Sequence, residues 1–119
     1  KTLENHIVPS INSAAVAAGK SAPRIIAGLP VILTNDTEEA KASIAKSLEI
    51  YGKLPAYRAM LDREGVSGPE DVALIGDEAE LREKIQRLRD IGVTDFNAAI
   101  EGYKDGVCER TWAFLKSEL

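Results

Sequence analysis

The chain has 119 residues, of which 45% are apolar and 29% are charged, and its formal net charge is −4. This length allows one domain, and the composition is too apolar for a disordered chain. Charges of both signs are mixed without a basic block, and the longest apolar run (residues 27–33) is far shorter than the roughly 18 residues of a membrane span. The first residues have neither a long apolar core nor a cleavage site, so we expect no signal peptide. We therefore expect a soluble, cytoplasmic α/β domain without nucleic-acid or membrane partners.

The N-terminal part predicts a helix followed by a strand. Residues 3–18 have helical spacing, with Pro9 either kinking the helix or starting it, and one face carries Leu3, Ile7, Ile11, Ala14, Ala15 and Ala18. Residues 24–33 are apolar on both faces, which is typical of a strand buried in a parallel sheet. Because Pro30 has no amide hydrogen, we expect this strand to bulge or end near it.

The middle of the chain predicts helices. Asp36 with Glu39 has the spacing of a capping box, and the helix that follows has an apolar stripe of Ala40, Ile44, Leu48 and Tyr51. A short helix over residues 55–65 comes next, and a short apolar run occupies residues 72–75. Asp77 and Glu80 repeat the capping pattern before a helix whose stripe contains Leu81, Ile85, Leu88 and Ile91.

The C-terminal part predicts a second strand over residues 93–100, a loop over residues 101–106 and a last helix. We expect that helix to bury one face, consisting of Cys108, Trp112, Leu115 and Leu119. Alternating helices and strands require parallel strands, so the strands near 25–33 and 94–100 should be adjacent and parallel. Two such strands alone leave bare edges, which predicts either a larger sheet or a homo-oligomer.

Several stretches resemble the luciferase-like family of flavin- or deazaflavin-dependent oxidoreductases. They are TLENHIVPSI (2–11), AGLPV (27–31) with TND (34–36), IYGKLPAYRAMLDREG (50–65), GPEDVALIGDE (68–78) and GVTDF (92–96). Stretch 50–65 is similar to the segment over the barrel mouth in the F-420-dependent branch. The resemblance implies a partial (β/α)8 TIM barrel, with residues 1–119 forming the C-terminal segment and the active site at the carboxyl ends of the strands.

The resemblance also implies a function. Family members use reduced FMN or coenzyme F-420 for hydride transfer or oxygen activation on a small-molecule substrate. Because the first barrel strands carry most of the cofactor pocket, this chain alone should be inactive and bind no cofactor. Carried over to this sequence, the cofactor-binding residues are Lys1, Thr2, Leu29, Glu101 and Gly102, and the substrate-binding residues are Tyr57 and Arg58. No catalytic residue is assigned.

Structural roles compete with these assignments. His6, the only histidine, fits a structural or solvated position better than an acid–base role, and Cys108, the only cysteine, fits a small buried side chain. With one of each, no His or Cys metal cluster is possible, and no metal site is expected. Loop polarity can explain Glu101, and packing can explain Tyr51. The alternative function is a small non-catalytic α/β protein that self-associates through its strand edges.

Overall fold

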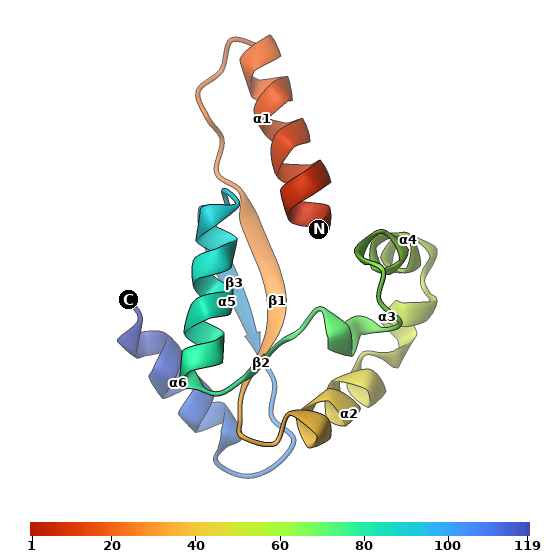
Figure 1. The fold of residues 1–119 in the computed structure, drawn as a ribbon, viewed down its shortest axis with the longest axis vertical. Coiled ribbons are helices and arrows are strands. Elements are labelled where there is room, and N and C mark those ends of the chain that lie inside the picture. The colour runs from red at the N-terminus through yellow and green to blue at the C-terminus, as the bar shows by residue number, and fades with distance from the viewer.

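The computed structural model describes residues 1–119 and shows a small parallel sheet with helices around it (Figure 1). The elements are a π-helical turn (Leu3–Ile7), α1 (Val8–Ala17), β1 (Ile26–Leu33), α2 (Thr37–Ser47), α3 (Glu49–Lys53), α4 (Pro55–Glu64), a 3-10 turn (Pro69–Asp71), β2 (Leu74–Gly76), α5 (Glu78–Asp90), β3 (Asp95–Ile100) and α6 (Val107–Ser117). No helix has the length and apolarity needed to cross a bilayer.

The sheet is parallel throughout, and its strand order is β2-β1-β3. The two predicted strands are adjacent, with Ile26 opposite Asp95 and Val31 opposite Ile100, which confirms the α/β class and this pairing. On the other side of β1, Leu33 lies opposite Gly76 of β2. This third strand was visible in the sequence only as a short apolar run.

The prediction that Pro30 would end or bulge the first strand was wrong, because β1 continues to Leu33. Backbone groups of successive residues point to alternate neighbours: the Val31 carbonyl accepts from the Glu101 amide of the β3 side at 3.2 Å, and the Thr34 amide donates to the Gly76 carbonyl of β2 at 2.9 Å. The Pro30 nitrogen therefore points toward β2. Pairing with β2 begins only at Val31, so no ladder hydrogen bond is lost.

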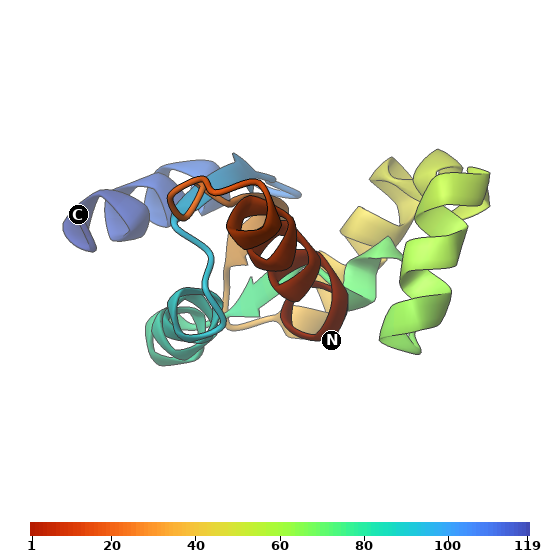
Figure 2. The same ribbon diagram turned by 90° about the horizontal axis from the view of Figure 1, so that it is seen from above.

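One face of the sheet packs against α5 and α6. The core on this face combines side chains from the strands β1 and β2, from the helices α5 and α6, and from the turn before β3. They are Ala27, Val31, Leu33, Leu74, Leu81, Ile85, Leu88, Val93 and Phe114. On the opposite face α2 covers only the carboxyl end of the strands, where Ile32 and Ile75 contact Ala40 and Ile44. Seen from above, α5 and α6 lie on one side of the sheet while α2, α3 and α4 extend to the other (Figure 2).

The amino-terminal half of that opposite face is open. Ile26 is 65% exposed, and Gly28, Asn97 and Ala99 are also exposed. The molecule measures 49 × 35 × 17 Å, and its accessible surface of 7443 Å² exceeds the about 6300 Å² typical of a compact monomer of this mass. A strand that is apolar on both faces thus has full cover on only one of them.

Helix α1 begins at Val8 and continues, without a break in the helical backbone, from the π-helical turn before it. Pro9 occupies the first turn of α1, directly after the π-helical turn, which is one of the two outcomes that the sequence allowed. Only Val8 of α1 is buried, and Val16 is 78% exposed. The helix projects beyond the sheet (Figure 1). Its predicted apolar face therefore has no cover along most of its length.

The predicted buried face of the last helix was wrong. Cys108 and Leu119 are exposed and Trp112 is 63% exposed, whereas α6 buries Val107, Thr111 and Phe114. The physical reason is a hydrogen bond: the Leu33 amide lies beyond the last pair of β1 and β3, and it donates to the Thr111 hydroxyl at 3.0 Å. The polar threonine must face the sheet, which turns the apolar stripe away from it.

Both predicted helix caps form, in different ways. Around Asp77 the capping box is complete, with Asp77 accepting from the Glu80 amide and Glu80 accepting from the Asp77 amide, both at 2.9 Å. Asp36 accepts from the Glu39 amide at 3.1 Å, but its own amide donates to Thr34 instead. The long helix predicted from Asp36 is divided at residue 48 into α2 and α3.

Candidate functional site

Polar side chains gather where β1 and β3 end. Parallel strands bring their carboxyl ends to the same edge of a sheet, which is where ligands bind in open α/β folds. Thr34 follows β1, is buried, and its hydroxyl lies 2.7 Å from the hydroxyl of Tyr103, which follows β3. The Thr34 hydroxyl also accepts from the Asp36 amide at 3.0 Å. These contacts fix two hydroxyl groups at the edge of a cavity.

This cavity has a volume of about 460 Å³ and lies between the end of β1 and the start of α6. Two cations line it. Arg110 donates to Asn35 at 3.0 Å and to Glu78 at 2.8 Å, and Lys104 donates to Glu39 at 3.3 Å. The arginine lowers the pKa of Glu78, and Glu39 raises the pKa of Lys104 through their hydrogen bond. Asp36 and Asp105 also line the cavity, so its lining carries charges of both signs and suits a small polar ligand.

Of the predicted site residues, Glu101 and Gly102 lie at this end of the sheet. Glu101 is half-buried, and its amide donates a hydrogen bond to the Val31 carbonyl. Gly102 approaches α6 closely, since a Cβ there would lie 2.4 Å from the Cys108 sulfur. The missing side chain of Gly102 therefore makes room for the first turn of α6. Packing explains this glycine without a ligand.

Leu29 is not at the cavity. It lies in the middle of β1 on the face covered by α5 and α6, half-buried against the main apolar core. A leucine at this position contributes to stability and faces away from the open side of the sheet.

Tyr57 and Arg58 lie on α4, far from the carboxyl end of the strands (Figure 1). Arg58 donates to the carbonyl oxygens of Ser67 at 2.8 Å and Val66 at 2.9 Å, and it pairs with Asp62. Its guanidinium thereby holds the loop after α4. Tyr57 is exposed and packs edge-on against Tyr51, with ring centroids 4.9 Å apart.

Lys1 and Thr2 contact a carboxylate of their own chain. The Thr2 amide donates to Glu64 at 2.6 Å, and the Lys1 α-ammonium donates to it at 3.1 Å. Partial burial opposes the ionised form of Glu64, but these donors outweigh it and lower its pKa. The buried Thr2 hydroxyl has no hydrogen-bond partner. This turn can hold an anion, and within the chain that anion is Glu64.

The seven predicted residues thus fall on separate parts of the molecule: the N-terminal turn, α4, the middle of β1 and the end of β3. The structure adds Thr34, Asn35 and Arg110 at the cavity, and Tyr103 as the hydrogen-bond partner of Thr34. The polar run directly after the first strand was the signal for Thr34 and Asn35. Nothing in the local sequence distinguishes Arg110 from the other exposed arginines.

The remaining side chains that could act in catalysis or bind a metal do not cluster. His6 is exposed on the π-helical turn, and nowhere do three or more His, Cys, Asp or Glu side chains gather as metal ligands would. Comparison with protein-family models, with curated proteins and with solved structures finds no match.

Proposed function

We propose that the chain is the C-terminal part of a luciferase-like oxidoreductase that uses a reduced flavin or deazaflavin for hydride transfer or oxygen activation. The observation that carries this proposal is the parallel pairing of β1 and β3 with helices packed against the sheet. In a (β/α)8 barrel the helices lie outside, and the inner faces of the strands are covered by the other strands. Here α5 and α6 cover one face, while on the other face Ile26, Gly28 and Ala99 are exposed and α2 covers only the carboxyl end. The strand order β2-β1-β3 places the first strand in the centre, whereas successive strands of such a barrel are neighbours in chain order.

The structure does not bring the assigned cofactor-binding residues together. Lys1, Leu29 and Glu101 lie on separate surfaces, and the polar cavity has a different lining. What the chain offers is one wall: the hydroxyl group of Thr34, which Tyr103 holds by a hydrogen bond, and the cation of Arg110 at the end where barrel enzymes hold their ligands. These groups would orient a polar substrate or a cofactor tail, and the remaining strands would supply the rest.

The test is to express the full reading frame that contains residues 1–119 and to examine the purified protein for flavin or deazaflavin absorbance. A bound cofactor is expected, and Tyr103→Phe should weaken its binding or that of the substrate. The matched control is Tyr51→Phe, on α3, which should leave binding unchanged. A frame with no barrel-like stretch before residue 1, or a complete protein that takes up neither cofactor, would refute the proposal.

The unpaired sheet edges favour a second candidate function. The outer edges of β2 and β3 have no partner strand, and an exposed edge is a template for pairing with another chain. A non-catalytic α/β protein that self-associates through these edges would bury them. Light scattering behind size exclusion at micromolar concentration tests this, because such a protein should elute as an oligomer.

A further inference from the structure

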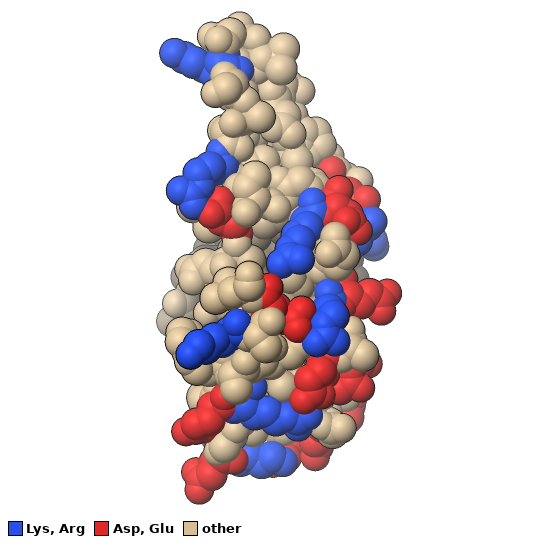
Figure 3. All heavy atoms as spheres, turned by 90° about the vertical axis from the view of Figure 1, so that its left-hand side faces the viewer, with Lys and Arg blue, Asp and Glu red and all other residues tan.

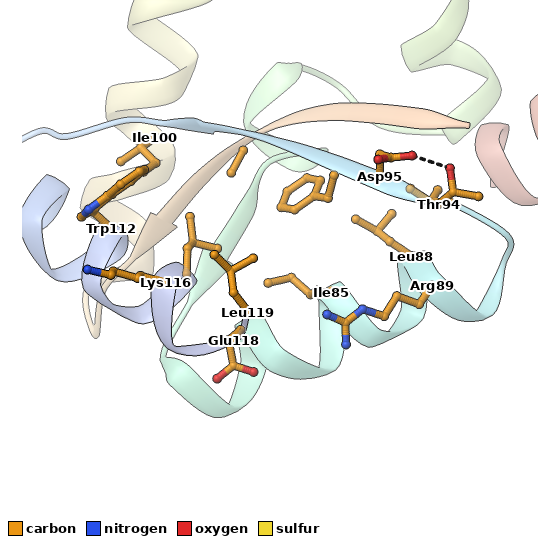
Figure 4. A pocket seen from close by; sticks show the side chains of 14 residues that line it. Ile85, Leu88, Arg89, Thr94, Asp95, Ile100, Trp112, Lys116, Glu118 and Leu119 are labelled. Carbon is orange, nitrogen blue, oxygen red and sulfur yellow. Dashed lines mark hydrogen bonds between the residues drawn. The ribbon is translucent and has the colours of Figure 1, made fainter. Parts of the chain in front are cut away.

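Helix α6 has a second apolar stripe, which faces away from the core. It consists of Cys108, Trp112, Leu115 and Leu119, of which all but the half-buried Leu115 are exposed. With Phe96, Ala98 and Ile100 of β3, the last three of these residues line a groove of about 680 Å³ between α5 and α6 (Figure 4). An apolar groove of this size on one side of a small chain marks a surface for binding.

The open edge of β3 borders this groove. The Asp95 amide donates to the Ile25 carbonyl and the Glu101 amide to the Val31 carbonyl, so the odd-numbered residues of β3 point their backbone groups toward β1. In a strand the intervening residues point the opposite way. The backbone groups of Phe96, Ala98 and Ile100 therefore face the edge that lacks a partner strand, and the side chains of these three residues line the groove.

We propose that a second copy of this chain docks here, about a two-fold axis perpendicular to the sheet. The two β3 strands then pair antiparallel, and the two α6 helices pack side by side through Trp112, Leu115 and Leu119. Such an interface is isologous, because the same patch is used twice. This inference rests on the self-association candidate above and needs no cofactor chemistry.

Charge complementarity selects a second copy over other occupants. Glu109 and Lys116 lie two helical turns apart along the solvent side of the stripe, and neither forms an ion pair within the chain. When two α6 helices run antiparallel, Lys116 of each copy comes beside Glu109 of the other. Elsewhere on this side, acidic and basic side chains are interspersed without a patch of one sign (Figure 3). A strongly charged partner therefore finds no complementary field.

The chain has surface available for a dimer interface. The accessible surface of 7443 Å² is about 1100 Å² larger than a compact monomer of this mass exposes. A standard interface buries about 800 Å² on each partner. This excess is spread over the open face of the sheet, the projecting α1 and the groove, so the groove and the β3 edge supply part of the area that a standard interface needs.

The experiment measures the mass of the 119-residue protein by light scattering behind size exclusion over a range of micromolar concentrations. The wild type should dimerise, and Lys116→Glu should raise the dimer dissociation constant roughly tenfold, because it replaces two attractions with two repulsions. Adding Glu109→Lys to that variant exchanges both charges and should restore the wild-type constant. The control is Lys46→Glu, which makes the same charge change at an exposed position of α2 and should leave the dimer dissociation constant unchanged.

Trp112 supplies an independent readout, since it is the only tryptophan. Its fluorescence should shift to the blue and become harder to quench with acrylamide as the dimer forms. A dimer that is insensitive to Lys116→Glu and leaves Trp112 quenchable would overturn this interface while self-association stands. A monomer at every concentration would overturn both. Capture of a fatty acid or an extended peptide by the monomer's groove would likewise contradict the assignment to a second copy.

Discussion

Replacing Thr111 with valine should destabilise the chain by removing one hydroxyl group at nearly constant volume. Thr111 is fully buried, and its hydroxyl accepts from the Leu33 amide at 3.0 Å while donating to the Val107 carbonyl at 2.8 Å. In Thr111→Val the Leu33 amide loses its acceptor inside the core. An orphaned buried donor costs about 1–3 kcal/mol. At roughly 3–6 °C per kcal/mol for a chain of this size, Tm should fall by about 3–18 °C.

The assay is urea unfolding followed by circular dichroism, with all variants at the same protein concentration because association shifts apparent stability. Thr37→Val is the matched control, since the Thr37 hydroxyl forms no hydrogen bond, and its free energy of unfolding should stay within about 0.5 kcal/mol of the wild type. If Thr111→Val proves as stable as the wild type, the Leu33 amide has another acceptor. The explanation of how α6 is oriented would then be wrong.

Three other perturbations test separate parts of the structure. Arg24 and Thr94 hydrogen-bond Asp95 and lower its pKa from 3.8 to about 2. Because the folded pKa is depressed, this stabilisation is complete above about pH 5 and is lost progressively as the pH falls through about 2. Asp95→Asn should flatten the profile of stability against pH in that window. Gly65→Ala should lower the free energy of unfolding, measured in urea, by about 1 kcal/mol, because Gly65 ends α4 at φ 78°. Gly28→Ala on the open face is the control and should leave the free energy of unfolding nearly unchanged. Glu64→Gln should leave the thermal midpoint less sensitive to pH near 4, because Lys1 and the Thr2 amide then contact no ionisable carboxyl.

Local patterns in the sequence predicted the elements that depend on local physics. The Asp77 and Glu80 spacing is enough for a capping box, because both hydrogen bonds close within one turn. Residues 24–33 are apolar on both faces, and this pattern is enough for a central parallel strand. The elements that the sequence did not predict depend on partners that are distant along the chain. β2 is only three residues long and exists because β1 lies beside it.

The face that α6 buries was also decided at a distance. Its two apolar stripes are both compatible with a buried side, and the residue that selects between them is Thr111, through an amide 78 positions away in the sequence. The candidate site follows the same division. Thr34 and Asn35 could be expected from their position after a strand, but Arg110 reaches the cavity only because α6 starts beside the end of β1.

Two surfaces of the chain are uncovered: the open face of the sheet, and the β3 edge with the outer side of α6. They would be covered by different partners, and this difference separates the two candidate functions. The open face carries Ile26, Gly28 and Ala99, with the Arg24–Asp95 ion pair at its amino-terminal end. The β3 edge with the outer side of α6 carries Trp112 and the opposite charges Glu109 and Lys116, which complement a two-fold copy of themselves. A dimer built there leaves the open face exposed, whereas barrel strands that closed the sheet would cover that face and take the β3 edge. Burial of Trp112 that depends on protein concentration therefore supports self-association, and burial that does not depend on concentration in the full reading frame supports the barrel.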